Sequence, residues 1–224
     1  MRFFLKIMAA CAVFTAAATA PAMAADTAGG KMQRVMPYME KFLSIPESER
    51  SLVRLAYRIK SRSQEESDIK AWYTLNGETT YLTLNKRGEL MDLPDLATYQ
   101  ANPTIETNVP KKDAVLAMRA RPNIPMTTSY DTPTLLASLE QTDKVGKRLA
   151  GFFMGLVRPT AKGYDFEVLT GTTGQVIGKD GTVTPLTIEW INPLVSHVEI
   201  RRDVLENASR VEFSEAPEII RYVE

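Results

Sequence analysis

The sequence predicts a mainly β protein made of β-sandwich-like modules, with a short N-terminal helix and a central helical segment. Two observations support this fold class. Short stretches that alternate apolar and polar residues recur along the chain, and turn-forming residues separate them. The alternative is a single α+β domain, in which one curved antiparallel sheet wraps around a helix at 143–158.

The chain begins with the features of a bacterial-type secretory signal peptide. An apolar, alanine-rich run follows the basic residues Arg2 and Lys6, and it ends in the small-x-small cleavage signal AMA at 22–24. The run is shorter than the roughly 20 apolar residues that a membrane-spanning helix needs. We therefore expect residues 1–24 to be removed after Ala24 and the mature protein to be periplasmic.

Loss of the signal peptide limits the chemistry that the mature chain can carry. It removes the only cysteine, Cys11, so we expect no disulfide, no thiolate nucleophile and no cysteine-based metal site. It also removes two of the 27 basic residues and none of the 27 acids. The basic excess that nucleic-acid binding requires is therefore missing, and no later segment is long and apolar enough to span a membrane.

The N-terminal module is predicted at 25–130. It begins with ADTAGGK, which we expect to be a flexible leader, and PYMEKFL at 37–43 follows as a short helix with proline in its first turn. LVRLAYRIK, from Leu52 to Lys60, alternates apolar with mostly basic residues, which is typical of a half-buried strand. IKAWYTL and TTYLTLN then flank Asn76-Gly77, a dipeptide that favours the tight turn of a hairpin.

Residues 131–161 form a predicted helical connector. Asp131 and Thr132 before Pro133 are a favourable helix start, and apolar residues at helical spacing continue through 143–158. Basic and aromatic residues in that stretch would also suit a helix lying on a membrane surface. Its three glycines favour close packing within the protein instead.

Strand-like segments return in the C-terminal module, at 162–224. The segments from Trp72 to Ile124 and from Phe166 to Ile219 share one order: aromatic strand, glycine turn, strand, long loop, two strands, and a proline two residues before an isoleucine. Such self-similarity is typical of repeated units. The C-terminal module is either a diverged repeat of 72–124 or an unrelated β-module with turns of similar length.

The order of these features resembles that of a known family. The signal peptide, the short helix, the alternating strands, the segment GELMDLP at 88–94 and the closing proline-x-isoleucine are similar to an exported proteobacterial protein family of unknown function. The resemblance covers most of the mature chain. It implies no catalytic residues, because that family has no assigned function.

Residues that could support catalysis are few. A hydrolase would use His197, the only histidine, or a pair of carboxylates as its acid and base. His197 lies on the opposite face from Val198 in a strand-like segment, so we interpret it as a solvated surface imidazole. One histidine without a cysteine is too few for a zinc site, and no motif indicates a cofactor. The residues favour a non-enzymatic role.

We therefore expect a periplasmic accessory or binding protein that recognises an envelope partner or a ligand through its loops and exposed sheet edges. Two alternatives stay open. One is a β-barrel-like carrier of a small apolar ligand, and the other is a carboxylate-dependent hydrolase. The candidate lining residues of the carrier are Trp72, Phe152, Phe153 and Trp190.

Overall fold

The computed structural model describes residues 26–155 and 160–223. The predicted signal peptide, residues 1–24, lies outside the described residues. Strands account for 43% and helices for 24%, and the strands form antiparallel sheets, so the mainly β fold class is confirmed. Among the described residues, no helix has the length and apolar character needed to cross a membrane.

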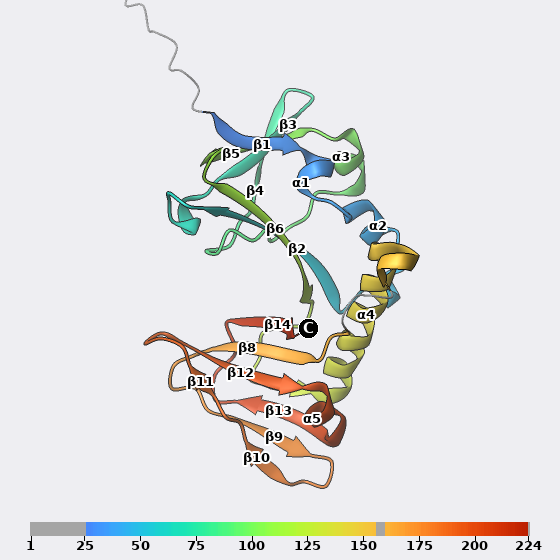
Figure 1. Cartoon of the computed structure of the whole chain (residues 1–224), viewed down its shortest axis with the longest axis vertical. Helices are drawn as coiled ribbons and strands as arrows, with labels where there is room; N and C mark the ends of the chain where they lie inside the picture. The colour runs from blue at the N-terminus through green and yellow to red at the C-terminus, as the bar shows by residue number, and fades with distance from the viewer. Residues whose placement is uncertain (1–25, 156–159, 224) are drawn as a thin grey trace, which may run out of the picture.

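The N-terminal half contains six strands and three short α-helices (Figure 1). The strands are β1 (Thr27–Lys31), β2 (Val53–Ser61), β3 (Ala71–Leu75), β4 (Glu78–Leu82), β5 (Thr104–Pro110) and β6 (Ala114–Pro122). The α-helices are α1 (Met32–Val35), α2 (Met39–Leu43) and α3 (Leu96–Ala101), and the 3-10 turns are η1 (Glu47–Glu49) and η2 (Glu66–Asp68). Four strands form a sheet in the order β1-β5-β3-β4, and β2 and β6 form a separate long ribbon.

The C-terminal half contains two four-stranded sheets, ordered β10-β9-β13-β7 and β11-β12-β8-β14. Their strands are β7 (Ser129–Asp131), β8 (Gly163–Leu169), β9 (Gly174–Gly178), β10 (Val183–Pro185), β11 (Glu189–Trp190), β12 (Val195–Arg201), β13 (Ala208–Phe213) and β14 (Ile219–Val223); the helix α5 (Arg202–Asn207) joins β12 to β13. Phe166 of one sheet packs against Phe213 of the other with ring centroids 5.1 Å apart. The two sheets therefore share one buried core, as in a sandwich.

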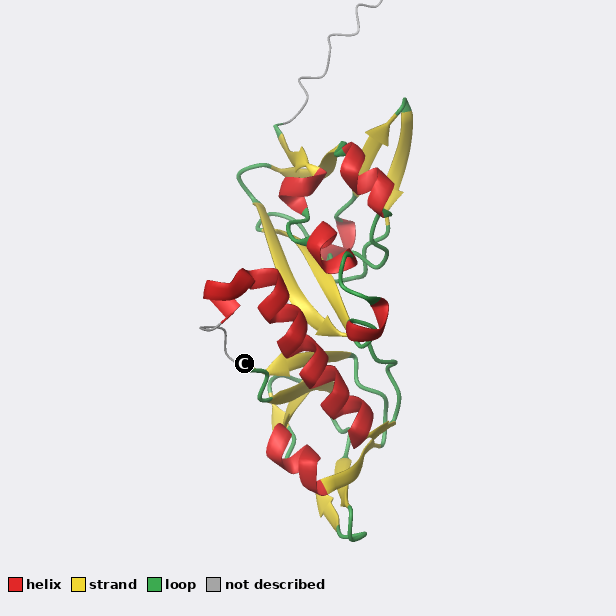
Figure 2. Cartoon of the chain, turned by 90° about the vertical axis from the view of Figure 1, so that its right-hand side faces the viewer, coloured by secondary structure: helices red, strands yellow, loops and turns green. Residues whose placement is uncertain are grey.

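One long helix, α4 (Thr132–Gly155), connects the halves. It begins after Asp131, whose carboxylate accepts a hydrogen bond from the Thr134 amide at 2.9 Å, as the sequence predicts for a helix cap. Leu135 near its start belongs to the C-terminal core, while Val145 further along belongs to the N-terminal core. Figure 2 shows the helix running along both halves, so it braces one core against the other.

The predicted flexible leader is wrong, because Thr27–Lys31 forms β1 and pairs with β5. The two glycines that suggested flexibility permit this pairing. A Cβ on Gly29 would lie 2.7 Å from the Ile105 carbonyl oxygen, so only glycine allows the strands to come this close. The helix expected at 37–43 begins at Met39 and is preceded by α1, which the sequence did not predict.

The predicted strand from Leu52 to Lys60 and the predicted hairpin are both confirmed. The strand is β2, at Val53–Ser61, and the hairpin joins β3 to β4. Asn76 and Gly77 both have positive φ, 54° and 85°, which is the conformation that such a two-residue turn requires. Local turn chemistry thus determines this element.

The two segments compared as a repeat, 72–124 and 166–219, differ in part of their strand pairing. β3 pairs with β5, and the strands at the corresponding positions in the C-terminal half, β8 and β12, pair in the same antiparallel way. β4 pairs with β3, however, whereas β9 pairs with β10 and β13 in the other sheet. The duplication of 72–124 stays a prediction.

Candidate functional site

A charged cluster lies on the face of β8 that points away from the C-terminal core. Asp165 and Glu167 share this face because they alternate with buried core residues. His197 on β12 is paired in register with Glu167, and Arg221 on β14 is paired with Asp165. Arg87, in the loop after β4, reaches the cluster from the N-terminal half. We call these five residues the junction cluster.

Glu167 is the buried centre of the junction cluster. Its carboxylate accepts hydrogen bonds from both Arg87 and Arg221. Arg221 also donates to Asp165 Oδ2 at 2.9 Å. His197 lies between the two acids, with Nδ1 3.0 Å from Asp165 Oδ1 and Nε2 3.5 Å from Glu167 Oε2.

The two arginines set the charge state of Glu167. Burial alone would raise the pKa of this carboxyl, but hydrogen bonds and positive charge from Arg87 and Arg221 outweigh burial and hold the pKa below its ordinary value. In the same way, burial would lower the pKa of Arg221, but Glu167 and Asp165 raise it. Both shifts favour the charged forms of Glu167 and Arg221 near neutral pH.

Such a cluster is poorly suited to acid–base catalysis. A catalytic acid needs a pKa near the working pH, and the pKa of Glu167 is moved in the opposite direction. Among the described residues, His197 forms side-chain hydrogen bonds only with Asp165, so no hydroxyl is positioned as a nucleophile. What the arrangement does is connect the halves, because Arg87 binds Glu167 across the junction.

A second buried carboxylate follows the same pattern. Glu89, two residues after Arg87, is buried and forms an isolated bridge with Arg58 of β2, and its carboxylate is bound by Arg54 and Arg121. Burial would raise its pKa, but these arginines lower it below the ordinary value. Both buried glutamates are thus neutralised by arginine pairs, which indicates structural roles for them.

The position of His197 differs from the sequence interpretation. Its side chain does point away from the core, opposite Val198, but it is half-buried and flanked by two acids rather than solvated. Alternation within β12 reveals the face of a residue but not the neighbouring strands. The signal that could have identified the cluster is the alternation of charges in YDFEV, SHVEIRR and IIRYV, which become neighbours in one sheet.

The four residues predicted to line a ligand site are not gathered in one place by the described structure. Trp72 lies half-buried on β3, where its Nε1 donates to Glu106 Oε2 at 2.7 Å. Trp190 lies on β11 in the other half of the molecule. Phe152 and Phe153 belong to α4, and their side chains lie outside the described residues.

Trp190 instead belongs to a group of exposed apolar side chains on β11, the loop after it and the end of β8. We call this group the apolar corner. It consists of Leu169, Trp190, Ile191 and Leu194, with exposed fractions of 43%, 65%, 53% and 75%. The Thr170 amide donates to the Leu194 carbonyl at 3.2 Å, which joins the end of β8 to the loop between β11 and β12. Asn192 Oδ1 accepts from the amides of Leu194 and Val195, so the loop has a fixed shape.

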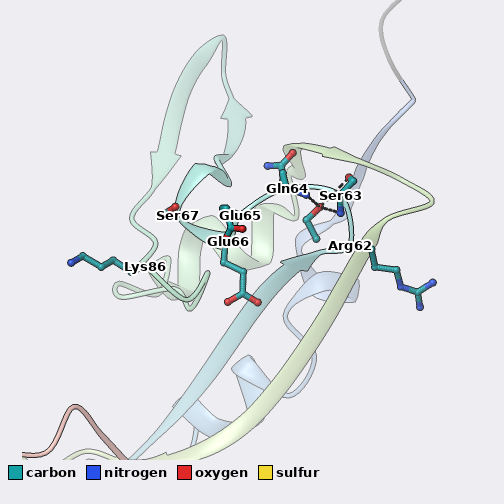
Figure 3. Close-up of a pocket in the computed structure, with 8 residues that line it drawn as sticks. Arg62, Ser63, Gln64, Glu65, Glu66, Ser67 and Lys86 are labelled. Carbon is teal, nitrogen blue, oxygen red and sulfur yellow. Dashed lines mark hydrogen bonds between the residues drawn. The ribbon is translucent and has the colours of Figure 1, made fainter. Parts of the chain in front are cut away.

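A polar pocket of about 670 Å³ lies over the connection between β2 and β3 (Figure 3). Its lining consists of residues 61–67 and Lys86 and includes no large apolar side chain. Ser61 Oγ accepts hydrogen bonds from the amides of Ser63 and Gln64, and Glu66 is bound to Arg58 at 2.6 Å. Figure 3 shows Lys86 and Arg62 at opposite ends, pointing apart. These residues stabilise a connecting loop and do not converge on a ligand.

Comparison with known proteins adds one match. The model of a family described as "Protein of unknown function (DUF2987)" matches residues 39–168. This range runs from α2 through α4 to β8, and so it extends from the N-terminal core into the C-terminal one. It agrees with the resemblance to a family of unknown function. Neither the curated proteins nor the solved structures give a match.

Proposed function

We propose a function from the geometry, because this chain belongs to the DUF2987 family, described as a protein of unknown function. In this proposal the chain is a periplasmic binding protein without enzymatic activity, and it recognises a partner protein of the cell envelope through the apolar corner. The features of a signal peptide at residues 1–24 support the periplasmic location.

The observation that carries the proposal is the exposure of the apolar corner. Four large apolar side chains around the β11–β12 loop are exposed, with Trp190 and Leu169 on opposite faces of the sheet edge. Burying them is favourable, by up to about 1.5–3 kcal/mol for a large apolar side chain that was fully exposed. Single exposed apolar residues are ordinary, but several on one strand, its loop and the neighbouring strand end are typical of interaction sites. Trp190 strengthens this interpretation because tryptophan is enriched among residues that dominate binding energy.

The surroundings of the corner favour a protein partner. β11 is the outer strand of its sheet, so an extended segment of a partner can pair with it. Asn192 accepts hydrogen bonds from the Thr170 hydroxyl and the Leu194 amide, and these hold the loop before binding, which lowers the entropy lost on association. A partner with a small apolar pocket next to an extended segment would match both features.

The hydrolase alternative has less support. The acids brought together on β8 are paired with arginines, and the pKa of Glu167 is lowered rather than raised. A carboxylate-dependent mechanism needs one acid that is protonated near neutral pH. The junction cluster therefore favours the non-enzymatic proposal.

Site-specific photo-crosslinking in the native host tests the proposal. A photo-reactive phenylalanine analogue replaces Leu194 in the full-length chain, and the same analogue replaces Tyr81, a similarly exposed residue in the N-terminal half. We expect one discrete heavier product from position 194 and none from position 81. Adding Trp190→Ala should remove that product.

Two results would contradict the proposal. Identical products at both positions would indicate contacts without specificity. A product that contains only two copies of this chain would identify the apolar corner as a self-association surface rather than a site for a partner.

A further inference from the structure

A groove lies in the N-terminal half where β5 and β6 diverge. The two strands are joined by a short turn but belong to different sheets, β5 to the four-stranded sheet and β6 to the ribbon. The groove between them has a volume of about 400 Å³, within the range of roughly 300–1,000 Å³ typical of small-molecule sites. Twelve residues line it, contributed by β1, α1, β2, β5, β6 and the β5–β6 turn.

The groove has apolar walls that are partly open to solvent. Ile59 and Ile105 are buried members of the N-terminal core. Val115 and Leu116, on β6, are exposed although both are large and apolar. Covering them with an apolar chain would remove apolar surface from water, which favours binding.

One wall carries almost no side chain. β1 contributes Ala28, Gly29 and Gly30, and Gly29 is required because a Cβ there would meet the Ile105 carbonyl oxygen at 2.7 Å. Glycine in a strand leaves the backbone accessible to a close approach by a ligand. The glycines that permit β1 to pair with β5 therefore also keep this side of the groove free of bulk.

The charged residues that line the groove are all basic. Arg34, in the last turn of α1, and Lys111, in the β5–β6 turn, both line the groove, and none of the twelve lining residues is acidic. Within residues 26–155 and 160–223, no carboxylate oxygen lies within 4.0 Å of the charged nitrogens of Arg34 or Lys111. An apolar cavity with two cations attracts a ligand of opposite charge.

We infer that the groove binds an anionic amphiphile, a molecule with one negatively charged headgroup and an apolar chain. Val115 and Leu116 cover the chain, and Arg34 and Lys111 hold the headgroup. The ligand is either a free fatty acid or an anionic lipid, since a carboxylate and a phosphate are recognised by the same two cations. The groove shares no residue with the apolar corner, so it adds a ligand to the proposed protein partner and does not depend on that proposal.

Calorimetric titration of the whole mature chain tests ligand binding in the groove. The anionic probes are dodecanoate and the short-chain lipid dihexanoyl phosphatidylglycerol, and dodecanol and dodecyltrimethylammonium serve as neutral and cationic controls. We expect saturable binding of an anionic probe at one site per chain, with weaker binding of dodecanol and none of the cation. The tighter of the two anionic probes identifies the source of the headgroup.

Charge reversals locate the site. Arg34→Glu and Lys111→Glu should each weaken binding of the anionic probe about tenfold or more, because attraction becomes repulsion at the headgroup. Lys112→Glu is the matched control, since Lys112 is an exposed neighbour that does not line the groove, and it should change affinity by no more than about twofold. All three residues are exposed, and equal melting temperatures would verify that the variants fold.

Three results would overturn the inference. The first is no binding of either anionic probe. The second is equal affinity for the anionic, neutral and cationic twelve-carbon probes. The third is binding that both groove reversals leave unchanged, or that Lys112→Glu weakens as strongly as they do.

Discussion

Glu167→Gln should destabilise the protein by about 3 kcal/mol at pH 7. The substitution keeps the size of the side chain and removes its charge, which leaves Arg87 and Arg221 without their shared buried partner. Removing one member of a buried ion pair costs roughly 3–5 kcal/mol. The low end applies because the Arg87 side chain is 38% exposed and can turn towards water.

The loss of stability caused by Glu167→Gln should be larger at neutral pH than in acid. The pKa of Glu167 is lower in the folded protein than its ordinary value of about 4.3. The contribution of the Glu167 carboxylate to the free energy of unfolding is therefore complete at pH values above the ordinary pKa. It disappears as the pH falls through the lowered pKa of the folded protein. The difference between wild type and Glu167→Gln should be full at pH 7 and should shrink below about pH 4.

Urea denaturation at a series of pH values measures this difference, with Glu199→Gln as the matched control. Glu199 is paired in register with Asp165 on the same face of the same sheet, but it is exposed. The comparison is repeated in a His197→Asn background, because His197 lies against both Asp165 and Glu167. A loss at pH 7 no larger than that of Glu199→Gln, or one that does not shrink in acid, would refute the structural role of the junction cluster.

Three further outcomes are expected. Arg87→Ala should lower the free energy of unfolding by about 1 kcal/mol, less than Glu167→Gln, because this arginine is partly exposed. Urea denaturation measures the loss, and a loss larger than that of Glu167→Gln would contradict our assignment of Glu167 as the centre of the junction cluster. Gly29→Ala should destabilise the protein by about 1–3 kcal/mol, because the added Cβ clashes with the Ile105 carbonyl oxygen. Gly30→Ala should destabilise it less, because its Cβ meets only the tip of the Val35 side chain at 3.3 Å. Thermal melts compare the two variants, and equal losses of stability would refute the close approach of β1 to β5. The intact mass of protein from a periplasmic fraction should correspond to a chain that begins at Ala25, and a mass that includes residues 1–24 would contradict the predicted cleavage.

The elements that the sequence predicts correctly are those set by local chemistry. The hairpin at Asn76-Gly77 follows from two residues that tolerate positive φ. The start of α4 follows from Asp131. β1 was missed because TAGGK has few of the residues favoured in strands, and its extended conformation depends on pairing with β5, about 75 residues later in the sequence.

The candidate sites were less predictable because they depend on which strands become neighbours. Asp165 and Glu167 can be assigned to one face from the sequence, but the approach of Arg221 and Arg87 results from tertiary pairing. Aromatic content suggested Trp72 and Trp190 as partners in one ligand site, yet their strands belong to separate sheets. Composition identifies residues that favour burial but not the cavity that they line.

Native mass spectrometry of the mature protein, released gently from the periplasm of its own host, tests the central claim most directly. We expect the wild-type chain to carry a second, different protein chain. The double variant Trp190→Ser and Leu194→Ser, which removes the two most exposed side chains of the apolar corner, should lose that chain. A bare wild-type monomer, or a partner that the double variant retains, would contradict recognition through the apolar corner.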